Sequence, residues 1–119
     1  LLSRLREPAK GQYWFPGGRV HKGELIQDAS VRKAHGETNL DCEYEKIISI
    51  EETIFEQCRD MLFDMHTVNI CCQLSVLDCH NLILDETHSS YIWIDLDQVV
   101  DFDLHPSVSI PIRKCLNNI

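Results

Sequence analysis

The segment GRVHKGELIQDASVRKAHGETNL, residues 18–40, decides the fold. It contains no proline, and residues 24–38 include good helix formers with small side chains between them. Asn39 follows, and after Gly it is the residue type that best tolerates the left-handed conformation past a helix end. We therefore predict a helix over residues 24–38 that ends at Asn39. Its amphipathicity is weak, because Arg32 interrupts the apolar side, and this pattern indicates a helix whose buried side carries polar residues.

Strand patterns lie on both sides of this helix. Residues 13–15 form a short aromatic strand that is expected in the core, and residues 46–50 are rich in Ile. Residues 67–77 alternate cleanly between apolar and polar side chains, which is typical of a half-buried strand. The predicted apolar face holds Val68, Ile70, Cys72, Leu74 and Val76. Residues 91–94 predict a further strand, followed by one or two helical turns over residues 95–100.

The C-terminal segment contains Pro106 and Pro111, which permit only a short or interrupted helix there. Taken together, the strands, the central helix and a second helix near the end predict an α/β (α+β) layered domain. No linker, repeat or low-complexity tract divides residues 1–119, so we expect a single domain.

Composition narrows the class of protein. The chain has 19 acidic and 11 basic side chains and a net charge of −8, which argues against nucleic acid as a partner, because that binding depends on many Lys and Arg side chains. No apolar run approaches the roughly 18 residues of a membrane span, so no membrane association is expected. The six cysteines show no framework spacing, which favours reduced thiols and a cytoplasmic protein.

The spacing within residues 18–40 resembles the Nudix box, the signature of the Nudix hydrolases. The matching positions are Gly18, Glu24, Arg32, Ala34, Glu37 and Leu40. The departures are Lys33, Gly36 and Asn39. The resemblance implies a Nudix-like α/β/α sandwich with a mixed β-sheet. Because Lys33 and Gly36 replace carboxylates, too few hard oxygen ligands remain for a multi-metal cluster, and one Mg²⁺ is expected, for which Mn²⁺ can substitute.

One branch with a reduced box, the GDP-mannose mannosyl hydrolases, is similar to this chain in further segments. These are residues 8–22, residues 85–93 and His105. The resemblance implies hydrolysis of a GDP-hexose to GDP and free sugar by cleavage of the C1–O bond with inversion. It also implies a homodimer. The family fold begins with strands ahead of the Arg4 region, so the domain over 1–119 is expected to be N-terminally incomplete.

The resemblance assigns roles to individual residues. His88 matches the general base, and Arg4, Arg19 and Arg32 match the arginines that bind the diphosphate and assist its departure. The metal ligands would be the Gly17 carbonyl, the Glu37 carboxylate and residue 87, where Thr87 stands in place of a Gln. Gly18 and Glu24 are expected to have structural roles within the box.

Two alternative functions stay open. The first is a conventional Nudix hydrolase that cleaves a P–O bond of a nucleoside diphosphate derivative. The second is a catalytically inactive Nudix-fold module that binds a nucleotide sugar or a protein. Thr87 in place of Gln favours the inactive module, whereas the loss of carboxylates at Lys33 and Gly36 disfavours the conventional hydrolase.

Overall fold

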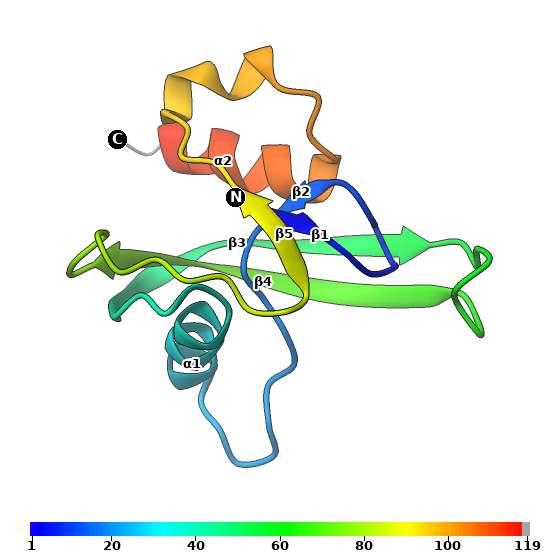
Figure 1. The fold of residues 1–119 in the computed structure, drawn as a ribbon, viewed down its shortest axis with the longest axis horizontal. Helices are drawn as coiled ribbons and strands as arrows, with labels where there is room; N and C mark the ends of the chain where they lie inside the picture. Colours follow the sequence, from blue (N-terminus) through cyan, green and yellow to red (C-terminus); the bar gives the residue numbers. More distant parts are fainter. Residues whose placement is uncertain (118–119) are drawn as a thin grey trace.

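The computed structural model describes residues 1–117 as eight elements of secondary structure (Figure 1). In chain order they are β1 (Leu2–Arg4), β2 (Tyr13–Trp14), α1 (Ile26–Thr38), β3 (Cys42–Phe55), β4 (Met65–Val76), β5 (His88–Tyr91), the 3-10 helix η1 (Leu96–Asp101) and α2 (Pro106–Asn117). Both α and β elements are therefore present, and the predicted α/β class is confirmed.

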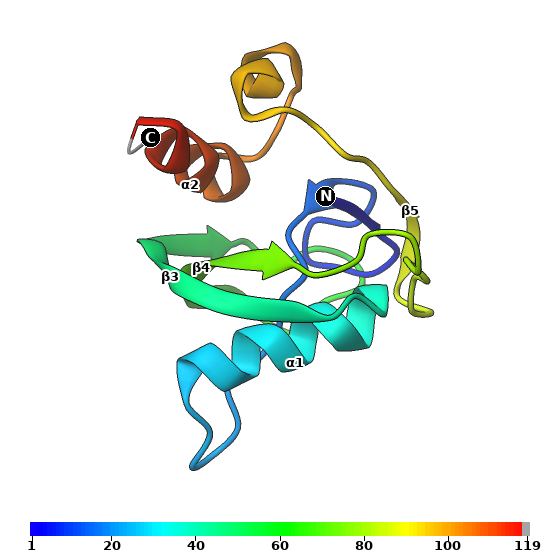
Figure 2. The same cartoon turned by 90° about the vertical axis from the view of Figure 1, so that its left-hand side faces the viewer.

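The elements form three layers. The long β3–β4 ribbon lies in the middle, with α1 on one side and α2 on the other, as Figures 1 and 2 show from two directions. The strands of residues 1–117 pair in two sheets, β2-β1-β5 and β3-β4, and every pair is antiparallel. The predicted sandwich is thus present, but the expected mixed sheet is replaced by two antiparallel ones. Short connections join β3 to β4 and β1 to β2, and such connections favour antiparallel pairing.

Helix α1 begins two residues later than predicted and ends where predicted. Leu25 is extended, so the helix starts at Ile26. At the other end Asn39 has φ 61° and ψ 12°, and its backbone N–H donates to the carbonyl of His35. The predicted helix cap is confirmed, and it turns the chain directly into β3.

Helix α2 corrects the expectation of a short or interrupted C-terminal helix. Pro106 occupies its first position, where the missing N–H costs little. Pro111 lies inside the helix and removes one internal hydrogen bond, yet the helix continues through it to Asn117. Pro111 and Val108 are fully buried, so packing of this helix against η1 and β3 outweighs the loss. No described helix has the length and apolar character needed to cross a bilayer.

The main hydrophobic core lies between α2, η1 and the smaller sheet. Its buried centre is formed by Val99, Val108 and Ile112. Trp14 and Phe15 pack against this centre, and the Trp14 ring lies 5.0 Å from the ring of His105. The aromatic strand is therefore part of the core, as predicted.

Strand β4 has the predicted alternation, but the first part of its apolar face is exposed. Val68 and Ile70 are 64% and 38% exposed. The opposite, polar face turns towards α2, where Asn69 donates a hydrogen bond of 2.9 Å to Thr53, whose hydroxyl in turn contacts Ser107 of α2. Periodicity correctly indicated two faces. Helix α2 packs on the polar face, and α1 lies on the other side of the ribbon.

Strand β5 also differs from the prediction, since it covers His88–Tyr91 and not residues 91–94. Its pairing with β1 sets this register: Arg4 lies opposite His88, and Leu2 lies opposite Tyr91. His88 is therefore the first residue of a strand in the smaller sheet, where its position is fixed by backbone hydrogen bonds.

Candidate active site

The last turn of α1 carries a buried carboxylate, Glu37, which is only 7% exposed. Its Oε2 accepts a hydrogen bond of 2.8 Å from the backbone N–H of Gly17, in the loop that precedes the helix. Its Oε1 lies 3.8 Å from the Nζ atom of Lys33, one turn earlier on the same helix. Burial raises the pKa of Glu37, despite the opposing effects of the Gly17 hydrogen bond and the Lys33 charge.

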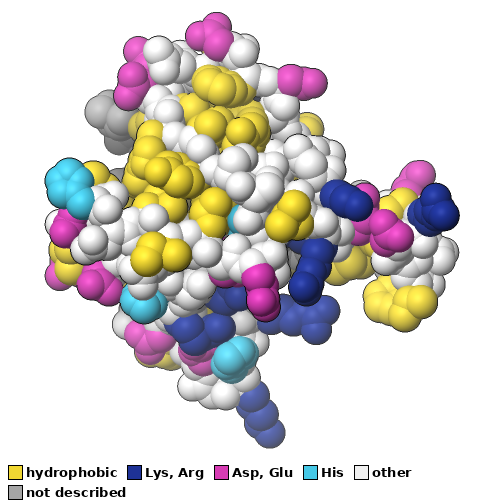
Figure 3. Space-filling model, in the orientation of Figure 1, with side chains coloured by type: hydrophobic (Ala, Val, Ile, Leu, Met, Phe, Trp, Pro, Cys, Tyr) yellow, Lys and Arg dark blue, Asp and Glu magenta, His cyan; other side chains and the backbone are white. Residues whose placement is uncertain are grey.

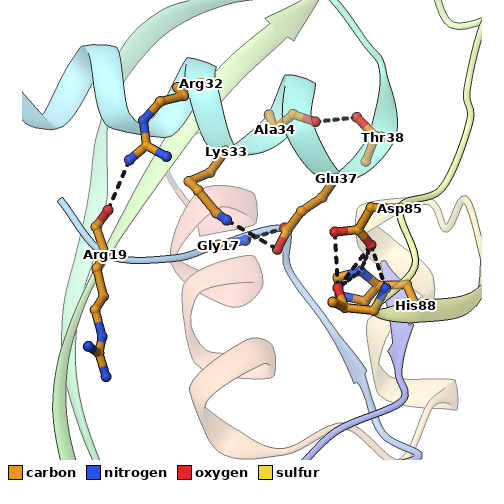
Figure 4. Close-up of polar contacts among 10 residues, drawn as sticks. Gly17, Arg19, Arg32, Lys33, Ala34, Glu37, Thr38, Asp85 and His88 are labelled. Carbon is orange, nitrogen blue, oxygen red and sulfur yellow. Dashed lines mark hydrogen bonds and ion pairs between the residues drawn. The ribbon is translucent and has the colours of Figure 1, made fainter. Parts of the chain in front are cut away.

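The loop ahead of β5 runs against the end of α1. The backbone N–H of Asp85 donates to the carbonyl of Glu37 at 3.1 Å, and that of Ile83 donates to the carbonyl of Thr38 at 2.9 Å. These bonds satisfy carbonyls that the end of a helix leaves unpaired. As a result, Asp85 and His88 are held beside Glu37 (Figure 4).

Asp85 forms a compact hydrogen-bonded group with the two residues that follow Glu86. Its Oδ1 lies 2.7 Å from Nδ1 of His88, and its two oxygens accept from the Thr87 hydroxyl at 2.9 and 3.0 Å. Burial alone would raise the pKa of Asp85, but the hydrogen bonds from His88 and Thr87 outweigh it and lower that pKa. Asp85 is therefore held as a carboxylate.

This geometry assigns the tautomer of His88. A carboxylate only accepts hydrogen bonds, so Nδ1 of His88 carries the hydrogen that it shares with Asp85. In the neutral ring Nε2 is then the atom with a free lone pair. The side chain of His88 is 2% exposed, which fixes the ring orientation and shields it from bulk water. A general base oriented by a carboxylate has this arrangement.

Glu37, Asp85 and His88 could together hold a divalent cation. Each offers one ligand atom, and these atoms lie within 4.8 Å of one another. The carboxylates of Glu37 and Asp85 suit a single ion such as Mg²⁺ or Mn²⁺, with water and substrate oxygens completing the coordination, and this leaves Nε2 of His88 free to accept a proton. The buried carboxylate of Glu37 has one nearby side-chain cation, Lys33, which leaves its charge only partly compensated.

Arg32 forms an ion pair with Glu24. Its Nε donates to Oε2 at 2.7 Å and one Nη to Oε1 at 2.9 Å, and the same Nη also donates to the carbonyl of Arg19. Glu24 further accepts the backbone N–H of His21. These hydrogen bonds, with that from Arg32 the strongest, lower the pKa of Glu24 to about 2. The pair fastens the loop before α1 to the helix.

Arg19 and Arg4 are the other arginines that the resemblance assigns to the site. The exposed side chain of Arg19 points away from the cluster of Glu37, Asp85 and His88 (Figure 4). Arg4 lies on β1 opposite His88, and its Nε donates to the carbonyl of Pro8 at 2.7 Å. The structure therefore brings Glu37, Thr87 and His88 together, with the Gly17 backbone beside them. It does not gather the three arginines there.

Asp85 is the site residue that the sequence reasoning missed. It lies within residues 85–93, where only Thr87 and His88 are assigned roles by the resemblance, yet its carboxylate contacts His88. The available signal was the spacing of three residues between Asp85 and His88, with a hydroxyl residue between them. That spacing suits a tight turn in which a carboxylate and an imidazole meet.

The chain matches the family described as the NUDIX domain over residues 1–115. It therefore belongs to the Nudix domain family. A solved structure, that of a MutT protein from Methanosarcina mazei Go1, superposes with a TM-score of 0.75 and covers 98% of this chain and 82% of that one. The identity is 19%, so this likeness supports the fold alone.

Several curated proteins share sequence with this chain. The low-salt glycan biosynthesis protein Agl8 of Haloferax volcanii is 31% identical over 87 residues, which is 72% of this chain and 55% of that protein. The 8-oxo-dGDP phosphatase NUDT18 of Homo sapiens is 35% identical over 52 residues, 44% of this chain and 16% of that protein. Nudix hydrolase 2 of Arabidopsis thaliana is 40% identical over 48 residues, 40% of this chain and 17% of that protein. The matched part is thus at most about half of each relative.

Proposed function

We propose that this Nudix domain hydrolyses a GDP-hexose of the GDP-mannose type to GDP and free sugar, with one Mg²⁺ bound. The observation that carries the proposal is the hydrogen-bonded pair of His88 and Asp85 beside Glu37. A general base and a metal-binding carboxylate, held side by side, are what the attack of water on a diphosphate ester of a sugar requires.

The reaction assigns a task to each side chain. Nε2 of His88 takes a proton from water while the water oxygen bonds to C1 of the sugar, on the face opposite the departing diphosphate. The C1–O bond breaks, its electron pair leaves with GDP, and the configuration at C1 inverts. Asp85 holds the imidazole and stabilises the imidazolium that forms.

Glu37 and Asp85 would hold the metal, and their oxygens suit Mg²⁺. When bound, the metal neutralises charge on the diphosphate. The Thr87 hydroxyl, which donates to Asp85, would orient that carboxylate and not act as a ligand itself. This is a different use of residue 87 from the one that the sequence resemblance implies.

Two further observations support an anionic nucleotide-sugar substrate. In an acidic protein, Lys and Arg side chains gather in the lower centre of the face shown in Figure 3, near α1 and the loop ahead of it. In addition, Agl8 is named for glycan biosynthesis, a process that consumes activated sugars.

The competing reaction is cleavage of a P–O bond, and the name of NUDT18, an 8-oxo-dGDP phosphatase, keeps it under consideration. Hydrolysis in ¹⁸O-labelled water separates the two reactions. Label in the released sugar supports C1–O cleavage, and label in a phosphate overturns it.

The test of activity is incubation of the protein with GDP-mannose and Mg²⁺, with release of GDP and sugar as the readout. Calorimetry on the same sample measures binding. Binding without turnover at every Mg²⁺ or Mn²⁺ concentration would contradict the proposal and favour an inactive nucleotide-sugar-binding module.

A further inference from the structure

We infer that Lys33 is a resident counter-cation of Glu37 that competes with the divalent metal for this carboxylate. The inference rests on the metal site of the proposed function, but it concerns binding and not turnover. It arises from the position of one side chain relative to the carboxylate and to the loop before α1.

The Lys33 ammonium lies beside the Glu37 carboxylate. Lys33 precedes Glu37 by one helical turn, and Nζ lies 3.8 Å from Oε1. The Glu37 side chain is 10% exposed and the Lys33 side chain 31%, so the ammonium closes the open side of a nearly buried carboxylate. The other carboxylate oxygen is occupied by the Gly17 N–H. Oε1 is therefore the oxygen that both the ammonium and a metal would use.

The side chain of Lys33 reaches Glu37 by passing over Gly18. A Cβ atom added to Gly18 would lie 2.3 Å from Cε and 2.8 Å from Cδ of Lys33. The aliphatic part of Lys33 thus crosses directly over the bare backbone of Gly18 to reach Glu37. Figure 4 shows the side chain extending from the helix towards the Gly17 backbone and the Glu37 carboxylate. Gly18 leaves the space through which Lys33 passes.

The position of the Lys33 ammonium affects metal binding. A divalent ion between Glu37, Asp85 and His88 would lie close to the Lys33 ammonium, and like charges at that distance repel. Metal binding must therefore displace the ammonium from Oε1. The partly exposed lysine side chain can turn outward into solvent.

The experiment is a Mn²⁺ titration of the full chain without substrate, in which electron paramagnetic resonance measures free Mn²⁺. Lys33→Met removes the competing charge and should lower the Mn²⁺ dissociation constant by roughly three- to tenfold. Lys22→Met, which removes an exposed lysine from the loop before α1, is the matched control and should leave the constant unchanged. Lys33→Arg keeps the charge and should stay close to the wild type.

Gly18→Ala gives a second, independent variant. It retains Lys33, but the added methyl group forces the flexible side chain off its path, so Mn²⁺ should again bind more tightly. In the Gly18→Ala, Lys33→Met double variant the two effects should not add, since both act through one contact.

The results separate this inference from the proposed function. If Lys33→Met binds Mn²⁺ no more tightly than the wild type, or if neither protein binds it, the competition does not exist. If Lys33→Met binds Mn²⁺ detectably and the wild type does not, the inference is supported in its strongest form. Lack of GDP-mannose hydrolysis by the wild type would overturn the proposed function and leave the titration result standing.

Discussion

Nδ1 of His88 lies 2.7 Å from Oδ1 of Asp85, and both residues are held against the end of α1 by the backbone bond from Asp85 to Glu37. The short segment between the two side chains thus fixes a base and its orienting carboxylate in one turn.

Asp85→Asn should reduce kcat for GDP-mannose by about 10²- to 10⁴-fold, the usual contribution of general acid–base catalysis. The amide can donate to Nδ1, which would place the hydrogen on Nε2 and remove the free lone pair that water needs. Steady-state kinetics at saturating substrate and Mg²⁺ measures the effect. Glu86→Gln, an equal change of charge on the exposed neighbour, should retain activity. Equal losses of kcat in both variants would contradict the role assigned to Asp85.

His88→Ala should remove most of the activity while nucleotide-sugar binding persists, because the imidazole takes a proton and is not needed to hold the diphosphate. Turnover and calorimetric binding of GDP-mannose are measured on the same preparation. Full activity of the variant would contradict the role of His88 as the base.

Glu37→Gln should weaken Mn²⁺ binding at least about tenfold, because a carboxylate ligand is lost. The metal-free variant should unfold at the same temperature as the wild type or higher. Burial raises the pKa of Glu37, so its charged form is costly in the folded protein, whereas Gln still accepts the Gly17 hydrogen bond. Thermal unfolding with and without Mn²⁺ measures both quantities. A less stable variant without metal would show that the charge itself stabilises the fold.

The ion pair of Glu24 and Arg32 should make stability depend on pH in the acidic range. The folded-state pKa of Glu24 is about 2, below the ordinary 4.5. A lowered pKa means that the pair stabilises the fold fully above pH 4.5 and loses this effect as the pH falls towards 2. The difference in unfolding temperature between wild type and Glu24→Gln should therefore shrink from pH 6 to pH 2.5. A constant difference would mean that the ion pair is not its source.

Two variants of Asn39 separate the effect of its backbone conformation from the effect of its side-chain hydrogen bond. Asn39→Gly and Asn39→Ala both remove the hydrogen bond from Asn39 to the carbonyl of Asn81, but only Ala has a Cβ that opposes φ 61°. The Ala variant should be less stable than the Gly variant by about 1 kcal/mol. Urea unfolding measures the difference, and equal stabilities would argue against a left-handed cap in solution.

The sequence predicted the features that depend on local chemistry. The helix ending at Asn39 and the alternation of residues 67–77 follow from backbone preferences and from the two-residue repeat of a strand. Whether Pro111 interrupts a helix depends instead on how much packing that helix gains. Likewise, alternation identifies the two faces of β4 but not the face that α2 covers, because that depends on distant residues such as Ser107.

The residues of the site also divide into those that the local sequence indicates and those that the fold brings into place. The box spacing singled out Glu37 and the flanking match singled out His88, whereas Asp85 is placed by backbone bonds between the loop and the end of α1. The family resemblance also implied arginines around the diphosphate. In the structure the Arg32 guanidinium is engaged by Glu24, and Lys33 is the cation that reaches Glu37.

The exposed apolar side chains of β4 have a practical consequence for work with the purified domain. Val68 and Ile70 present apolar surface, and within residues 1–117 the ribbon pairs only β3 with β4, so strand edges remain available to another chain. Reversible self-association at high protein concentration is therefore expected, and it would shift apparent unfolding temperatures by mass action. Comparisons between variants should be made at one dilute concentration, with light scattering recorded beside each melt.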